Sequence, residues 1–123
     1  MRKTILFLIL SMAPLAPLHA QSMPVATFLA KADALKKKGA LAFFSGDLGR
    51  LKSEIQNSGK AIRLEHQAAV KAGRKPGFCI PAKASFTSTE LLDHFRAIPP
   101  AQRNMPVKAA FASLVRKKYP CPS

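Results

Sequence analysis

The chain has two cysteines, Cys79 and Cys121, and the second lies between two prolines just before the C-terminus. A cysteine in a free tail has no structural role, whereas a disulfide to Cys79 would tie the tail to the body of the protein. Such a bridge closes a loop of about 40 residues and stabilises a small domain by roughly 2–4 kcal/mol. Because one domain of about 100 residues has only a marginal core, this pairing constrains the fold strongly.

The first 20 residues have the layout of a secretory signal peptide. Arg2 and Lys3 provide a positive start, and a short apolar run follows that cannot span a bilayer. Ala20 is the small residue expected at the cleavage point. We therefore expect a periplasmic or secreted protein that is soluble after cleavage, with a single domain over residues 21–123. An oxidising compartment favours a disulfide between the two cysteines over a metal site or a catalytic pair.

Apolar residues recur at helical spacing in four segments, and strand-like alternation is absent over any useful length. The segments cover residues 22–39, 47–73, 86–100 and 104–120. Gly39 is placed to end the first helix, and Ser45 or Asp47 to begin the second. The sequence predicts an all-α fold, a small bundle of about four helices stapled by one disulfide.

The third segment has a well-defined helix start. Thr87 and Glu90 are spaced as a capping box, in which each residue satisfies a free backbone N–H of the other. Phe86 and Leu91 have the spacing of the hydrophobic staple that accompanies such a box. We expect this helix to begin at Thr87.

For four residues outside this helix the sequence also predicts a structural role. Ser22 is placed to cap the first helix, and Phe43 and Phe44, in an apolar connector, are expected to fill the core. Gly59 lies on the apolar stripe of the second helix, where it either admits another helix closely or marks a kink. A homodimer through this stripe is a further hypothesis.

Catalytic chemistry has little support in the sequence. Beyond the signal segment the only histidines are His66 and His94, on separate predicted helices. The six acidic residues show only ordinary helix spacing. No glycine-rich phosphate loop and no H-x-E or C-x-x-C spacing occurs. We therefore expect a protein that is not an enzyme and that holds no cofactor or metal.

Positive charge is the strongest chemical signal. Two of the 20 basic residues lie in the signal segment, so 18 remain against 6 acidic ones, a net charge of +12. They cluster near predicted helix ends, at Lys36–Lys38, at Lys71, Arg74 and Lys75, and at Arg116–Lys118. Such charge steers a protein towards acidic partners. Nucleic acid is not the expected partner, because export separates it from the chain and the sequence has no Trp and one Tyr for base stacking.

The C-terminal half also carries a recognisable pattern. A Cys-x-Pro element is followed by an apolar helix ending near a proline, and then by an Ala-rich helix that closes on aromatic-Pro-Cys. Over about the last 45 residues this pattern resembles the Rap/Tai family of type VI secretion immunity proteins. The matching residues are Cys79, Pro81, Leu91, Leu92, Phe95, Pro99, Ala109, Ala110, Leu114, Tyr119, Pro120 and Cys121.

The resemblance implies a small helical immunity protein of the periplasm. Its partner would be a peptidoglycan amidase delivered by neighbouring or sister cells through a type VI secretion system. The implied inhibition is by occlusion, in which a loop or helix end of the immunity protein blocks the catalytic cleft of the amidase.

Residues 73–85 are predicted to form an exposed loop, and its segment AGRKPGF, residues 72–78, is the first candidate for contact with a partner. Arg74 and Lys75 lie at its tip and Phe78 precedes the cysteine, while Arg103, between the last two helices, is the second candidate. A disulfide at the loop would fix its geometry and lower the cost of ordering it on binding.

Two other function classes stay open. One is an exported cationic helical protein that binds cell-wall or lipopolysaccharide anions, and its binding would collapse with salt. The other is a periplasmic chaperone-like protein, which would expose apolar surface.

Overall fold

The computed structural model of the protein describes residues 22–122, so the predicted signal peptide over residues 1–20 lies outside the described part. The described chain forms helices and no β-strand, with only one isolated backbone bridge. The elements are α1 (Val25–Lys38), the 3-10 helix η1 (Gly39–Phe44), α2 (Gly46–Lys71), α3 (Ser88–Ala97), the 3-10 helix η2 (Pro100–Gln102) and α4 (Val107–Lys118). The prediction of an all-α bundle of about four helices is confirmed. Within this part of the chain, no helix is both long and apolar enough to cross a membrane.

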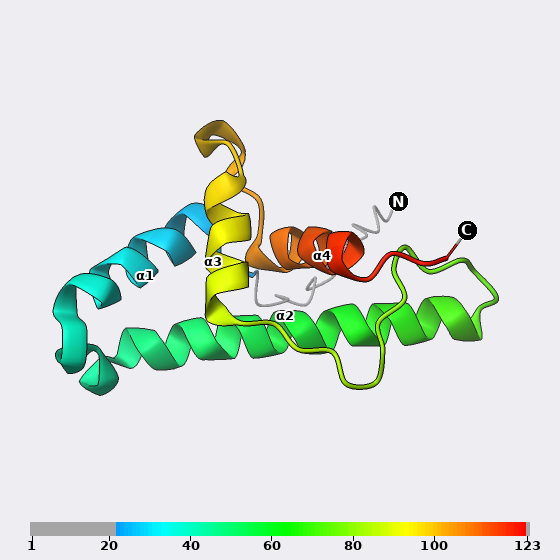
Figure 1. Ribbon diagram of the computed structural model, residues 1–123, viewed down its shortest axis with the longest axis horizontal. Helices are drawn as coiled ribbons and strands as arrows, with labels where there is room; N and C mark the ends of the chain where they lie inside the picture. Colours follow the sequence, from blue (N-terminus) through cyan, green and yellow to red (C-terminus); the bar gives the residue numbers. More distant parts are fainter. Residues whose placement is uncertain (1–21, 123) are drawn as a thin grey trace, which may run out of the picture.

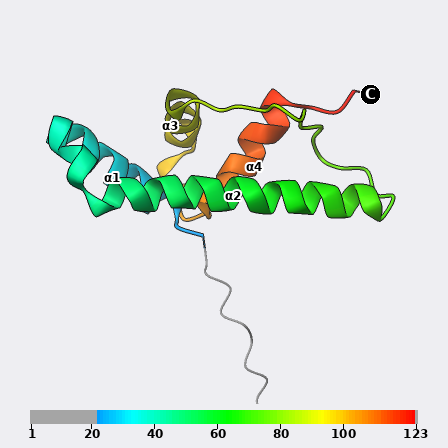
Figure 2. The ribbon, with the colours of Figure 1, turned by 90° about the horizontal axis from the view of Figure 1, so that it is seen from below.

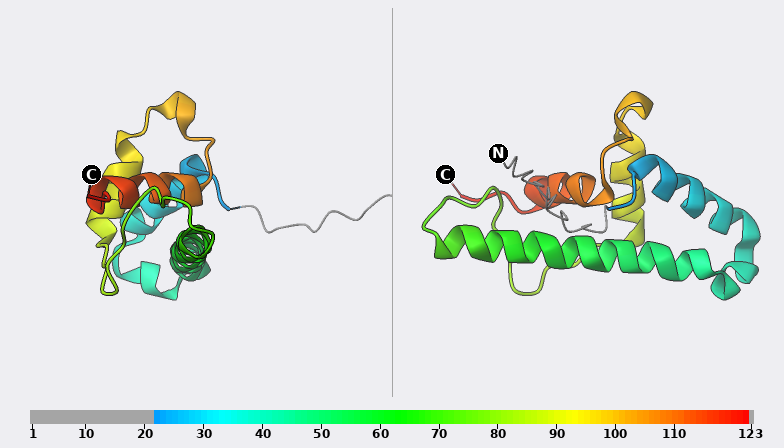
Figure 3. Two further views of the ribbon diagram at one scale, coloured as in Figure 1. Left: turned by 90° about the vertical axis from the view of Figure 1, so that its right-hand side faces the viewer. Right: turned by 180° about the vertical axis from the view of Figure 1, so that it is seen from behind.

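Helix α2, with 26 residues, runs along the whole length of the molecule, and the other helices pack on one side of it (Figure 1). Its most extensive contact is with α4, which crosses it obliquely, while α3 stands across it and is seen nearly end-on in Figure 2. Helix α1 packs along the N-terminal half of α2. The turn from α1 into α2 therefore lies at one end of the molecule, and the loop that follows α2 lies at the other (Figure 3).

The core lies between α2 and the three shorter helices. Its largest fully buried side chains are Val25, Ile62, Phe95, Val107 and Val115. Each shorter helix contributes an apolar face at helical spacing, as the sequence predicts. These faces account for the fold, because burial of apolar surface is its main driving force.

Gly59 lies where α2 and α4 approach each other. A β-carbon at this position would lie 3.4 Å from the Cε1 atom of Phe111, at the short limit of ordinary van der Waals contact. The helix is continuous through Gly59 and straight in Figure 1, so close approach rather than a kink explains this glycine. The stripe around Gly59 packs against α4 of the same chain.

Helices α1 and α4 begin side by side and satisfy each other's free backbone N–H groups. Val25 N donates to Met105 O at 3.0 Å, and Val107 N donates to Met23 O at 2.8 Å. The prediction that Ser22 caps α1 is wrong, because Pro24 occupies the capping position. Its hydroxyl instead accepts from Lys108 N at 3.1 Å at the start of α4. The N-termini are thus capped by tertiary contacts, which local sequence rules do not describe.

The predicted start of α3 is confirmed in detail. The Thr87 hydroxyl accepts from Glu90 N at 3.1 Å, and Thr87 N donates to the Glu90 carboxylate at 2.8 Å. Ser45 caps α2 by accepting from Asp47 N at 3.3 Å. Gly39 ends α1 with a positive φ of 55°, a conformation that suits glycine.

The prediction that Phe43 and Phe44 fill the core is wrong. Both rings lie in η1 at the far end of the molecule, and their exposed fractions are 79% and 90%. Leu41 in the same 3-10 helix is 70% exposed. The connector turns beyond the last buried residue of α1, so its apolar side chains extend past the core instead of into it.

Candidate functional site

The predicted disulfide between Cys79 and Cys121 is present, with 4.8 Å between the two α-carbons. A backbone hydrogen bond from Cys79 N to Tyr119 O, at 2.9 Å, joins the same two segments. The neighbouring ring of Phe78 stacks on His66 of α2, with 5.4 Å between the ring centroids. The loop after α2 is thus held to the tail that follows α4 by a covalent bond, and to α2 by a buried ring. We call this region, residues 72–81 with 119–121, the stapled end.

Arg74 and Lys75 are exposed in this loop, as the sequence predicted. Gly73, with a φ of 68°, reverses the chain after α2, and Arg74 N donates to Ala69 O at 2.9 Å. The turn directs the chain away from the helix axis, and the two cations lie at the surface beside the last two turns of α2. They line a shallow hollow of about 220 Å³ together with Glu65, His66, Ala69, Pro76, Gly77 and Phe78.

The structure places Phe78 and Arg103 in structural roles. Phe78 is 8% exposed and belongs to the core, so it anchors the loop and is not available at its surface. The Arg103 guanidinium donates to Ile98 O at 2.9 Å and to Arg96 O at 2.8 Å, at the end of α3. A cation that donates to the last carbonyls of a helix satisfies groups that the helix leaves free. Phe78 lines the same hollow as Arg74 and Lys75, whereas Arg103 is not among the residues that line it.

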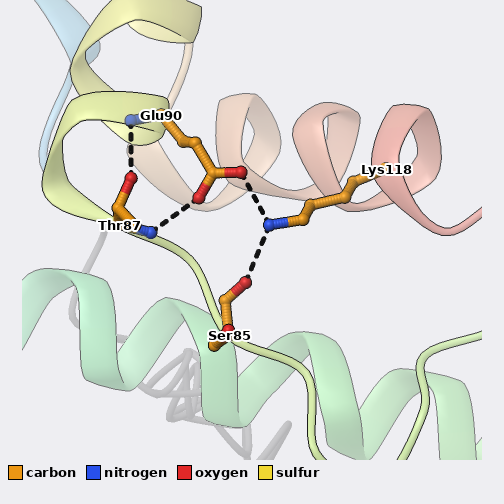
Figure 4. Close-up of polar contacts among 4 residues, drawn as sticks. All are labelled: Ser85, Thr87, Glu90 and Lys118. Carbon is orange, nitrogen blue, oxygen red and sulfur yellow. Dashed lines mark hydrogen bonds and ion pairs between the residues drawn. The ribbon is translucent and has the colours of Figure 1, made fainter.

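Helix α3 is tied to the end of α4 by a polar cluster (Figure 4). The Lys118 ammonium donates to the Glu90 carboxylate at 2.6 Å and to Ser85 O at 3.0 Å, while Glu90 also accepts from Thr87 N. The hydrogen bond from Lys118, with that from Thr87, lowers the pKa of Glu90 from 4.5 to about 2. The same carboxylate raises the pKa of Lys118. This cluster holds the segment that follows the stapled loop.

Each of the two histidines contacts a neighbouring side chain, His66 the ring of Phe78 and His94 the hydroxyl of Ser113. His94 Nε2 lies 2.7 Å from the Ser113 hydroxyl, which itself donates to Ala110 O at 2.7 Å. Because the Ser113 hydroxyl donates its only proton to the Ala110 carbonyl, His94 Nε2 is the donor to Ser113. Burial lowers the pKa of His94, which favours the neutral ring. Among residues 22–122, no group of three or more His, Cys, Asp or Glu side chains is placed to hold a metal ion.

A groove runs along α2 that was not predicted from the sequence. It consists of two adjoining hollows of about 400 and 630 Å³ that share Ile55, Gln56, Phe86 and Leu91. Apart from Ser88 of α3, its polar lining comes from one stripe of α2, at Lys52, Gln56, Lys60, Arg63 and Gln67, and no acidic residue lines it. The signal was present in the spacing of that stripe, which follows a helical face next to the apolar one.

Known proteins give no match to this chain. No family model matches it, and neither a curated protein nor a solved structure is significantly similar to it. The function is therefore proposed from the geometry of the described residues together with the resemblance in the C-terminal half.

Proposed function

We propose that the protein is a periplasmic immunity-type protein that binds and inhibits a peptidoglycan amidase of a type VI secretion system by occluding its active site. The observation that carries the proposal is an exposed cationic loop, with Arg74 and Lys75, that is anchored on both sides of its tip. The resemblance of the C-terminal half supplies the class of partner. The geometry supports the mode of action.

An occluding loop has to hold its shape before it binds. Ordering one backbone residue costs about 1–2 kcal/mol, and this cost is subtracted from the affinity when a flexible loop enters a cleft. Here the disulfide and the bond from Cys79 N to Tyr119 O hold the loop on the tail side of its tip. The bond from Arg74 N to Ala69 O holds it on the helix side. The loop therefore presents its cations with little left to order.

The charge around the loop defines the surface that it fits. The Arg116 side chain lies beside Gly77, where a β-carbon would be 3.7 Å from its Cδ atom, and so adds a third cation to Arg74 and Lys75. The nearby Glu65 carboxylate pairs with Lys108. The loop accordingly suits an acidic surface around the partner's cleft, and such complementarity raises association rates and specificity.

The test uses the exported protein, with a tag after Ser123, as bait for periplasmic and secreted fractions. Columns are washed at low and at high salt, and retained proteins are identified by mass spectrometry. We expect one cell-wall hydrolase to remain at high salt, because a packed interface is screened less than exposed charge. The double variant R74E/K75E should lower its retention at least tenfold. The matched control K36E/K37E reverses the same charge at the other end of the molecule and should retain the hydrolase.

Three outcomes would contradict the proposal. The first is that no hydrolase is retained under either wash. The second is equal retention by R74E/K75E and by the unchanged protein, which would exclude the loop. The third is capture of anionic envelope material that high salt removes, which would favour the alternative function of a cationic protein that binds cell-wall or lipopolysaccharide anions.

A further inference from the structure

The end of the molecule opposite the stapled loop exposes three large apolar side chains. Leu41, Phe43 and Phe44 all lie in η1, and Phe44 is the most exposed large hydrophobic residue described. In a 3-10 helix, residues three apart lie on the same side, so Leu41 and Phe44 share one side of η1 with Phe43 adjacent. We call Lys36–Phe44 the apolar tip. Solvated apolar rings carry a free-energy cost, so a surface of this kind usually has a partner.

The chain at the tip and on either side of it is strongly basic. The chain from Lys31 to Lys52 carries six basic and two acidic residues. Both carboxylates are already paired, Asp47 with Lys31 and Asp33 with Arg96, each at 2.8 Å. The remaining five cations form no ion pair within residues 22–122: Lys36, Lys37, Lys38, Arg50 and Lys52. The tip therefore combines exposed apolar side chains with uncompensated positive charge.

The shape of this region favours a flat partner. Helices α1 and α2 meet at η1, which forms one extreme of the elongated molecule in Figures 1 and 2. A projecting end can enter a planar surface without a matching cavity. The apolar rings can enter the boundary between head groups and acyl chains, while lysines on flexible stems reach the phosphates.

We propose that the apolar tip binds the surface of a lipid bilayer that contains anionic phospholipids. The apolar side chains insert below the head groups, and Lys36–Lys38 with Arg50 contact the lipid phosphates. Two attractions of this kind act together, as stable membrane anchoring requires. This inference does not depend on the amidase proposal, because the tip and the stapled loop lie at opposite ends of α2.

A second copy of the chain fits the tip less well. Aromatic side chains bury about 150–250 Å² each, so two rings and one leucine fall short of the roughly 800 Å² per partner of a standard interface. Like charges on two tips would also repel each other. Both arguments favour the bilayer as the occupant.

Sedimentation with vesicles tests the proposal. The protein is isolated as cells make it, its N-terminus is determined by mass spectrometry, and every variant carries the same N-terminus. Vesicles contain either phosphatidylcholine alone or phosphatidylcholine with phosphatidylglycerol. We expect binding to the anionic vesicles and at least tenfold weaker binding to the neutral ones. F43S/F44S should lower the affinity for anionic vesicles by about tenfold or more, because both rings leave water on binding.

The lysines have a separate expected effect. Each lysine near an anionic surface contributes about fivefold in affinity at moderate salt, so K36Q/K37Q/K38Q should weaken binding by up to about 100-fold. The matched control is L64S/V70S, which removes two side chains of α2 that are 56% and 54% exposed but lie away from the tip. It should bind as the unchanged protein does.

Fluorescence gives a direct reading of insertion. The chain has no tryptophan, so F44W introduces a single reporter at the tip and V70W introduces one elsewhere. Anionic vesicles should shift the emission of F44W to shorter wavelength and leave V70W unchanged.

Any of three results would overturn the proposal. The first is that F43S/F44S binds anionic vesicles as well as the unchanged protein. The second is equal binding to neutral vesicles. The third is a dimer of the unchanged protein, in sedimentation without vesicles, that F43S/F44S abolishes, because the tip would then be an interface between copies.

Discussion

The two ends of α2 are built from similar residues, but phenylalanine is buried at one end and exposed at the other. Each end carries phenylalanine near a cluster of lysine or arginine. At each end a glycine with positive φ, Gly39 or Gly73, precedes the phenylalanine in the chain. At the C-terminal end, Phe78 is buried and a disulfide joins the loop to the tail that follows α4. At the N-terminal end, Phe43 and Phe44 project from the molecule, and no disulfide ties η1 to another part of the chain.

The difference shows what places an aromatic ring inside a small domain. Phe78 finds His66 of α2 to stack on, and the adjacent segment is held by the bond between Cys79 and Tyr119. Phe43 and Phe44 follow a helix that ends level with the core, so no element lies beyond them to cover them. Burial here depends on where the chain is fixed by distant contacts, more than on the apolar character of the residue.

Replacing a phenylalanine at each end should give the largest difference in stability between the two ends. Phe78→Ala should lower the free energy of unfolding by about 3–5 kcal/mol, because it empties a buried site. Chemical denaturation followed by circular dichroism measures this loss. The control is Phe44→Ala, and a similar loss for the two variants would contradict the comparison.

Removal of the disulfide should have the next largest effect. Cys79→Ser with Cys121→Ser should lower the free energy of unfolding by about 2–4 kcal/mol, because the unfolded chain regains the freedom that the bridge removes. In hydrogen exchange, the amide of Cys79 should lose protection, while amides of η1 stay as they were. Unchanged protection at Cys79 would mean that the hydrogen bond and Phe78 hold the loop without the bridge.

Acid should weaken the link between α3 and α4. Glu90 has a pKa of about 2 in the folded protein against an ordinary 4.5, so its contribution is complete above pH 4.5 and is lost as the pH falls towards 2. The effect should be smaller than the two above, because the pair is partly exposed and screened. Thermal unfolding of Glu90→Gln should show a flatter dependence on pH over this window. Asp93→Asn removes the same charge from α3 without touching Lys118, and an equal change there would argue against the pair.

The smallest expected effect is at the tip. Phe43→Ser with Phe44→Ser should change the free energy of unfolding by less than about 0.5 kcal/mol, because both side chains are already in water. Denaturation under the conditions used for Phe78→Ala provides the direct comparison. A loss above 1 kcal/mol would mean that the rings pack on the body of the protein in solution.

The features that follow local rules were predictable from the sequence. The capping box of Thr87 and Glu90 and the end of α1 at Gly39 depend on residues within one helical turn. The disulfide was predictable because only one pairing exists. Glycines and prolines that interrupt the helical pattern after residue 72 predicted an exposed loop, and Arg74 and Lys75 are exposed in the structure.

The features that depend on distant contacts were not predictable. Ser22 forms hydrogen bonds with Glu54 and Lys108, and Arg103 caps α3 from beyond its end. No local sequence pattern predicts either role. The exposure of Phe43 and Phe44 depends on where α1 ends relative to the core, which is a property of the assembled fold. The groove along α2 likewise exists only after the loop and α4 have packed on the helix.

Inhibition of a captured hydrolase would show whether the stapled loop occludes a catalytic cleft. The hydrolase is purified and titrated with the protein while the release of peptide from peptidoglycan is measured. We predict that activity falls to near zero at a one-to-one ratio, that R74E/K75E weakens inhibition at least tenfold, and that K36E/K37E inhibits normally. Full hydrolase activity with saturating protein would contradict the account, and inhibition by R74E/K75E equal to that of the unchanged protein would show that the stapled loop does not occlude the cleft.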